Sequence, residues 1–289
     1  MLFNLFGSNK KQEFIDGYAQ KLADAAVEGE IDADLLEELI DYAREHDLSN
    51  KQLASAQALA CDKAFEELFQ NGYLDDDEYD LYKDLIDTCY MLKEDQKYKY
   101  TTISKRCNAI YKIQEKGLLP KVDPEFANVD YREGEDLHFA GPAKLMKEES
   151  GAEKLSGGVI AKGTFYKTGG PMVGESPKGW KENGPGVLWI TTERIGYRGK
   201  KGKFTLEIED LDHAELAKGL LLYYEKGEEH PEAVKLDDPE MAGLILSRII
   251  NGPPEENTEE SEEKTRNGKA LQAMARQSFF LFLVFIVFL

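Results

Sequence analysis

Apolar residues recur at intervals of three and four along the first 117 residues, which is the period of amphipathic α-helices. Each stripe covers one face of its helix, so the helices must bury these faces against one another. The pattern therefore predicts an all-helical bundle over residues 1–117. Five successive stripes carry it, at 14–25, 35–43, 53–68, 82–92 and 103–111.

After a linker at 118–136, the pattern changes to that of short β-strands. Strands are predicted in the segments GVIAKGTFYK, GVLWITTERIGYR, KFTLEIEDL, GLLLYYEKG and EAVKLDD. The glycine-rich segment 168–186 has no such apolar pattern and predicts a long loop. The chain is thus expected to contain a second, β-rich domain over residues 137–252.

An amphipathic helix closes this second domain. Asp238 is a typical N-cap, Pro239 suits the first helical position, and Gly252 followed by Pro253 predicts the end of the helix. Several strands followed by one such helix predict an α+β unit, in which the helix covers an open face or end of a curved antiparallel sheet. The whole chain is therefore expected to be a two-domain α+β protein.

The C-terminal residues differ from both domains. Residues 253–269 form an acidic segment typical of a disordered linker, and every residue from Phe279 to Leu289 is apolar. Eleven helical residues span about 16 Å, whereas a bilayer core is about 30 Å thick. We therefore expect residues 270–289 to be either a short membrane anchor or a span cut off by the end of this sequence. A buried core helix is the alternative.

Basic residues precede this apolar segment. An excess of Lys and Arg beside a membrane span favours the cytoplasmic side. We therefore expect a single C-terminal anchor with the folded part of the protein at the cytoplasmic face of the membrane. The basic residues are Lys264, Arg266, Lys269 and Arg276.

Composition and motifs narrow the function. A formal net charge of −19 argues against nucleic acid as the main partner, because an acidic surface repels phosphates. Cys61, Cys89 and Cys107 form no CxxC motif and are expected to be buried free thiols in a reducing compartment. Neither an HExxH nor a phosphate-binding GxxxxGK[ST] motif occurs, so we expect no enzymatic activity and no cofactor.

One region of this acidic chain is basic. Between Ile160 and Phe204, nine Lys or Arg residues are opposed by three Glu residues. Because each basic residue near an anionic membrane contributes about 1 kcal/mol, this region is a candidate site for a lipid or other anionic partner. A plain solvated turn is the alternative, since Lys is common in exposed hairpin turns and discourages edge-to-edge pairing. The residues at the predicted turn are Arg198, Lys200, Lys201 and Lys203.

An acidic cluster lies in the helical half. Hard cations such as Ca²⁺ and Mg²⁺ bind several converging oxygens, so the cluster is a candidate divalent-cation site. An EF-hand register fails, because it places Phe69 at a ligand position. The alternative is that the acids cap a helix and face the positive end of its dipole. The cluster consists of Asp75, Asp76, Asp77 and Glu78.

The segment GPGVLWITTERIGYRGKKGKFTLEIEDLDHAEL resembles bacterial pleckstrin-homology (PH) and GRAM-like domains over about residues 135–252. The resemblance implies a non-enzymatic domain that binds lipid headgroups, peptides or neighbouring protein. The glycine-rich insertion departs from the compact family pattern. The matching residues are Gly186, Leu188, Ile190, Thr191, Arg194, Ile195, Asp210 and Leu211.

The helical half is similar to tellurite-resistance TerB-like domains over about residues 10–117. Two segments, EGEIDADLLEE and NGYLDDDEYD, share the motif G-x-[IL]-D-x-D, and only the second adds Glu78 at the matching position. This resemblance implies an envelope- or metal-stress context.

Two functions follow from these patterns. The first is a membrane-associated adaptor whose PH/GRAM-like domain contacts lipid or protein at the cytoplasmic membrane face. The alternative is a divalent-metal-binding or metal-stress protein that acts through the acidic helical domain.

Overall fold

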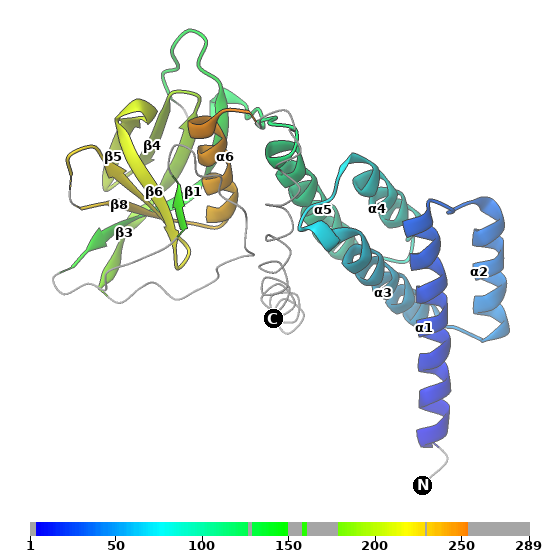
Figure 1. Ribbon diagram of the computed structural model, residues 1–289. Helices are drawn as coiled ribbons and strands as arrows, with labels where there is room; N and C mark the ends of the chain where they lie inside the picture. The colour runs from blue at the N-terminus through cyan, green and yellow to red at the C-terminus, as the bar shows by residue number, and fades with distance from the viewer. Residues whose placement is uncertain (1–3, 127–128, 150–157, 161–178, 229, 254–289) are drawn as a thin grey trace. The chain divides into compact units, whose positions relative to one another are not determined.

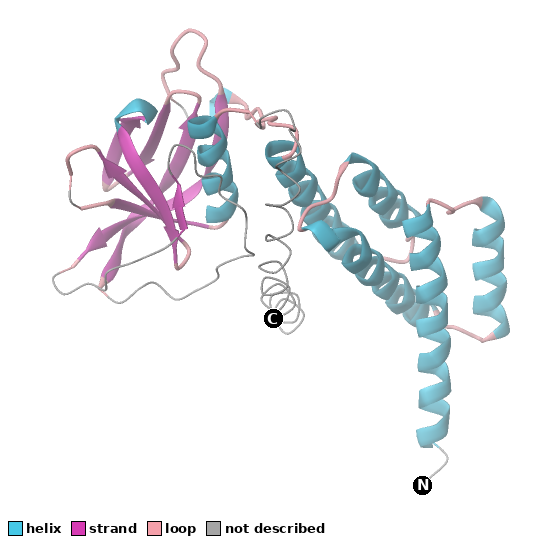
Figure 2. Ribbon diagram, in the orientation of Figure 1, coloured by secondary structure: helices cyan, strands magenta, loops and turns pink. Residues whose placement is uncertain are grey.

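The computed structural model describes residues 4–126, 129–149, 158–160, 179–228 and 230–253. Two compact units divide between Tyr111 and Lys112. The first is helical, and the second contains an antiparallel sheet followed by a helix (Figures 1 and 2). The predicted mixed α+β class, with helices first and a sheet and terminal helix after them, is thus confirmed.

Helices α1 and α3 form the centre of the first unit. Ala19, Ala56, Ala60 and Ala64 are fully buried, and such small side chains allow two helices to approach closely. α5 ends at Gln114, just beyond the division between the units. The helices are α1 (Asn4–Glu28), α2 (Ala33–Glu45), α3 (Asn50–Leu68), α4 (Asp76–Thr88) and α5 (Glu94–Gln114), with a 3₁₀ turn at Phe69–Asn71.

Helix α2 buries less of its apolar stripe than the sequence predicts. Leu39 and Ala43 are buried, but Leu36 is 36% and Ile40 is 42% exposed. α2 packs mainly on α1, and one neighbouring helix covers only the Leu39 side. The expectation that every stripe is buried within the bundle is therefore wrong for this helix.

The second unit is built on one eight-stranded antiparallel sheet with the strand order β2-β6-β7-β8-β1-β3-β4-β5. β1 pairs with β3 along its length and also with β8 over residues 143–146, so it joins the two parts of the sheet. The strands are β1 (Leu137–Glu148), β2 (Gly158–Ile160), β3 (Trp180–Thr191), β4 (Arg194–Gly199), β5 (Gly202–Glu207), β6 (Leu211–Ala217), β7 (Leu220–Glu225) and β8 (Glu232–Leu236).

Helix α6 (Pro239–Asn251) has the predicted ends. The Asp238 side chain accepts a hydrogen bond from the Met241 backbone N–H at 3.0 Å, and Gly252 is the C-cap. The helix packs on β6, β7, β1 and β2. Gly243 is the point of close approach, because a Cβ there would lie 2.5 Å from a methyl of Leu216. A side chain at this position would therefore push α6 away from the sheet.

Two local predictions were wrong, and one strand was missed. Residues 180–186 belong to β3 rather than to a loop, because the long strand β1 supplies a pairing partner for them. The run GVLWITTERIGYR is not one strand, since a turn at 192–193 separates β3 from β4. Strand β6 was not predicted, because its charged residues and the irregular pairing at its start hide the apolar alternation.

Candidate functional site

The predicted basic turn forms the end of the β4–β5 hairpin. Lys200 and Lys201 are its two turn residues, and Arg198 lies directly opposite Lys203 in the strand register. All four side chains are exposed. Like charges directly opposite each other destabilise a strand pair, so this arrangement has an energetic cost. We refer to Arg198, Lys200, Lys201 and Lys203 as the basic tip.

Glycines beside the basic tip make room for Tyr197. The Tyr197 hydroxyl donates a hydrogen bond to the Gly184 carbonyl at 2.9 Å, and the residue is only 2% exposed. A Cβ on Gly199 would lie 2.3 Å from the Tyr197 hydroxyl, and one on Gly186 would lie 2.5 Å from it. The Tyr197 ring therefore packs over Gly186 and Gly199, and its hydrogen bond to Gly184 connects the end of the hairpin to β3.

Further contacts brace the hairpin. The Phe204 ring lies between Tyr197 and Tyr223, with centroid distances of 6.0 and 4.6 Å. The alkyl chain of Lys201 lies against Gly184, whose own Cβ position would be 3.2 Å from Lys201 Cδ. The basic tip is therefore presented on a packed aromatic support.

In the described part of the chain, some basic residues of this region are neutralised by nearby carboxylates, whereas three lysines of the basic tip are not. Lys181 is paired with Glu149 at 2.7 Å, and Arg194 is paired with Glu135. Among the described residues, no ion pair is found for Lys200, Lys201 or Lys203. The other lysines of the sequence patch, Lys162, Lys167 and Lys178, lie outside the described residues.

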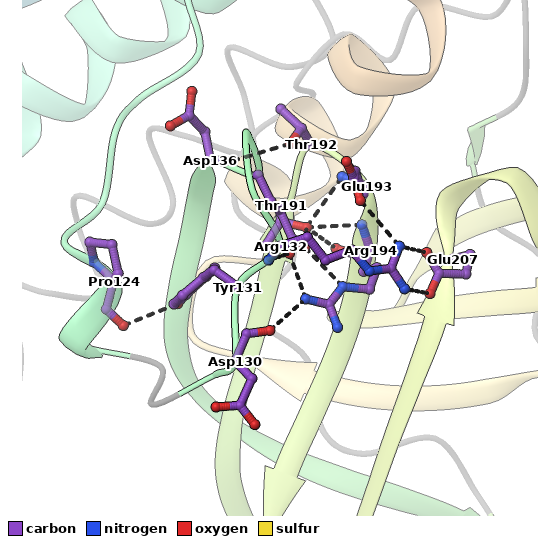
Figure 3. Close-up of polar contacts among 11 residues, drawn as sticks. Pro124, Asp130, Tyr131, Arg132, Asp136, Thr191, Thr192, Glu193, Arg194 and Glu207 are labelled. Atoms are coloured by element: carbon purple, nitrogen blue, oxygen red, sulfur yellow. Dashed lines mark hydrogen bonds and ion pairs between the residues drawn. The ribbon is translucent and has the colours of Figure 1, made fainter.

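The Thr-x-x-Arg motif shapes the turn that precedes this hairpin (Figure 3). The Thr191 hydroxyl oxygen accepts hydrogen bonds from the backbone N–H groups of Glu193 at 3.2 Å and Arg194 at 2.9 Å. Such side-chain bonds to a following backbone are typical of Thr in turns. Thr191 thus explains why the apolar run breaks into two strands at 192–193.

Arg194 holds a buried carboxylate. Its Nε donates to Glu135 Oε1 at 2.9 Å, and its Nη2 donates to Glu135 Oε2 at 2.5 Å and to the Asp130 carbonyl at 2.9 Å. The Thr191 hydroxyl also donates to Glu135 Oε1. The motif therefore fastens the end of the linker, residues 130–135, to the start of β4, as Figure 3 shows for Asp130, Thr191 and Arg194.

Glu135 is ionised because of these bonds. Burial alone would raise the pKa of this carboxyl, but hydrogen bonds from Arg194, Thr191 and the Arg132 backbone N–H outweigh burial and lower its pKa to about 2. Glu135 is 8% exposed, so few waters share the charge. Sequence reasoning did not find Glu135, because it is one of many acids near the linker and no spacing distinguishes it.

The acidic cluster begins helix α4. Asp75 is the N-cap, and its carboxylate accepts from the Glu78 N–H at 2.8 Å while the Glu78 carboxylate accepts from the Asp75 N–H at 2.8 Å. This reciprocal pair is a capping box. Asn108 of α5 donates to Asp76 Oδ1 at 3.1 Å, and Asp77 is exposed. Three of the four acids thus accept hydrogen bonds from the protein.

The two copies of the G-x-[IL]-D motif have the same local role. Gly29 and Gly72 both have positive φ, 74° and 85°. Asp32 and Asp75 then cap α2 and α4, each accepting from the backbone N–H three residues later. Helix initiation thus accounts for the glycine and the first aspartate of the motif. Within the described ranges, no group of three or more His, Cys, Asp or Glu side chains is placed to hold a metal ion.

Replacing Asp75 by alanine is expected to lower the free energy of unfolding by about 1 kcal/mol, because it removes the N-cap of α4. Urea unfolding followed by circular dichroism measures this loss. Asp77→Asn is the matched control and should change stability much less, since Asp77 is exposed and does not cap the helix. A loss for D75A that appears only with Ca²⁺ or Mg²⁺ present would contradict the capping explanation.

The expected membrane anchor at 270–289 lies outside the described residues. In the part of the chain that the structure does describe, no helix is both long and apolar enough to cross a bilayer.

The sequence matches no protein-family model, and a comparison with curated proteins finds no significant match. Function is therefore inferred from the chain's own residues.

Proposed function

We propose that this chain is a non-enzymatic, membrane-associated binding or adaptor protein that contacts anionic lipid at the cytoplasmic membrane face. The basic tip carries the proposal, because its exposed cations sit on a braced hairpin and Lys200, Lys201 and Lys203 have no carboxylate partner among the described residues. The overall charge of −19 repels an anionic surface, so contact requires a local basic site of this kind.

We infer that the sheet unit is a PH/GRAM-like domain. The order of its elements supports this, since strands β1, β3, β4 and β5 form a meander that three further strands and a closing helix follow. The Thr191 and Arg194 pair of the sequence motif also stands at the turn between β3 and β4. β2 lies between β1 and β3 in the sequence and is an additional strand outside this meander.

The apolar C-terminal segment supports membrane attachment by its sequence alone. A single weak membrane-binding element gives only reversible attachment. Two such elements, for example an apolar segment and a basic patch, together hold a protein stably at the membrane. An apolar segment from Phe279 to Leu289 combined with the basic tip supplies two such elements. The tail would keep the sheet unit near the bilayer, and the tip would respond to the charge of its lipids.

Vesicle binding of the full chain tests the role of the tip. Lys200→Gln together with Lys201→Gln should weaken binding to phosphatidylserine-containing vesicles about 30-fold, from about 1 kcal/mol for each lysine removed. Binding to neutral phosphatidylcholine vesicles should not change, because that binding depends on the apolar tail. The excess binding to anionic vesicles should fall as salt is raised.

A matched variant controls for net charge. Lys121→Gln with Lys226→Gln removes the same charge from two other exposed positions of the sheet unit and should bind like the unmodified chain. If K200Q/K201Q also binds anionic vesicles like the unmodified chain, the tip does not contact lipid. The basic tip would then be either a solvated turn or a site for an anionic protein.

A further inference from the structure

Two cysteines lie side by side in the interior of the helical unit. Cys61 is in the middle of α3, and Cys89 directly follows α4; their sulfur atoms are 3.8 Å apart. Both residues are 0% exposed and both are free thiols, as the sequence predicts. The third cysteine, Cys107 of α5, is also buried, and no sulfur contact is found for it among the described residues.

The backbone at Cys89 permits the two sulfurs to come closer. A disulfide needs a sulfur separation of about 2.0 Å, so the atoms must approach by about 1.8 Å. Cys89 lies past the last helical residue of α4, with φ −75° and ψ 73°. Its backbone N–H still donates to the Leu85 carbonyl at 3.0 Å, so the approach is made by rotation of the Cys89 side chain and by movement of the turn beyond this last helical bond. Cys61, by contrast, is fixed within α3.

We propose that Cys61 and Cys89 are a redox-sensitive pair that closes to an intrachain disulfide when a small disulfide oxidant, such as oxidised glutathione, is present. The thiolate of one cysteine attacks a sulfur of the oxidant and releases one glutathione. The other cysteine loses its proton and attacks the mixed disulfide, which releases the second glutathione. The pair loses two protons and two electrons, and the oxidant is reduced to two thiols.

The reduced pair is protected while the unit stays closed. The contact with Cys89 and the burial of the site raise the pKa of Cys61, so this residue remains a thiol. The turn after Cys89 is held by a hydrogen bond from the Met91 N–H to the Gln57 side chain at 2.9 Å. Because the thiolate is the attacking species, oxidation requires this turn to open locally. The reaction should thus be slower than oxidation of exposed thiols.

Mass spectrometry of the full chain tests the pair. Reduced protein is incubated with oxidised glutathione without denaturant, and the remaining thiols are then alkylated in denaturant. We expect a product about 2 Da lighter than the reduced chain before alkylation, with only Cys107 alkylated afterwards. Trypsin cleavage after Lys63 and Lys83 places Cys61 and Cys89 in separate peptides, so a cross-linked pair is found directly. A reductant should reverse the change.

Cysteine variants distinguish a Cys61–Cys89 disulfide from other oxidation products. Cys107→Ala should form the same cross-link, and the oxidised form should have a higher Tm, because the link closes a loop between residues 28 apart. Cys89→Ala should form no intrachain disulfide, with folding checked by circular dichroism. The proposal is overturned if C107A keeps two alkylatable thiols, if it stops at stable glutathione adducts, or if the native chain links only through Cys107.

Discussion

Replacing Arg194 by alanine is expected to lower the free energy of unfolding of the sheet unit by about 3–5 kcal/mol. The substitution leaves the Glu135 carboxylate buried without its cation, and it also removes the hydrogen bond to the Asp130 carbonyl. Removing one partner of a buried ion pair destabilises a protein by more than the intact pair stabilises it. The reason is that the remaining charge is then surrounded by neither water nor a cation. Urea unfolding of the purified chain, followed by Trp fluorescence, measures the effect.

Arg132 provides the matched comparison. Arg132 is paired with Glu193 and Glu207, but half of its side chain is exposed, at 51%. Arg132→Ala should therefore destabilise the sheet unit much less than Arg194→Ala does, as is usual for surface ion pairs. The double variant E135A/R194A should be less destabilised than the two single losses added together, because neither charge is then left alone. Equal stability of R194A and R132A would show that Glu135 is not held as the structure indicates.

Acid should remove about 3 kcal/mol of stability through Glu135 alone. The pKa of this carboxyl is about 2 in the folded chain and 4.5 for the unperturbed group, and each pH unit of difference corresponds to about 1.4 kcal/mol. A folded-state pKa below the unfolded one stabilises the protein above about pH 4.5. This contribution is lost progressively as the pH falls from about 4.5 to about 2.

The measurement needs a reference, because many other carboxyls titrate in the same range. The free energy of unfolding is measured by urea at several pH values for the unmodified chain and for Glu135→Gln. The gap between the two should narrow by about 3 kcal/mol between pH 5 and pH 2. Glu209→Gln changes an exposed acid of the same unit and should run parallel to the unmodified chain. A gap for E135Q that stays constant over this range would refute a depressed pKa.

The sequence predicts those parts of the fold that depend only on neighbouring residues, such as helical periodicity, helix ends and turns. Helical stripes gave the helices of the first unit, and the Asp238, Pro239 and Gly252 signals gave α6 with its correct ends. The basic tip was also correctly placed at a hairpin turn, because glycine and lysine between two apolar alternations are a local signal.

Features that depend on distant pairing could not be predicted. Residues 180–186 look like a loop by composition, and only the ladder with β1 makes them a strand. The turn at 192–193 is hidden inside an apolar run, since it depends on hydrogen bonds to the Thr191 side chain. Thr191 and Arg194 were correctly singled out as a motif, but their partner Glu135 lies 56 and 59 residues away along the chain. No periodicity connects positions so far apart.

For the acidic cluster, the sequence allowed two explanations, a divalent-cation site and helix capping. The geometry favours helix capping. Asp75 and Glu78 each accept a backbone N–H at the start of α4, which matches the capping alternative. A helix N-terminus attracts acids whether or not a cation is present, so a run of carboxylates at such a position is weak support for a metal site.

The two-sided pairing of β1 has a consequence for synthesis on the ribosome. The meander of β1, β3, β4 and β5 uses neighbouring segments, so its pairing can form while translation continues. The second edge of β1 has no partner until β8 is made, because Ala143 pairs with Leu236. During that interval, Met146 and Trp180, which are covered by residues of β6, β7 and β8 in the finished fold, remain accessible to other chains and to chaperones. The sheet unit therefore cannot cover Met146 and Trp180 until β8 has been synthesised.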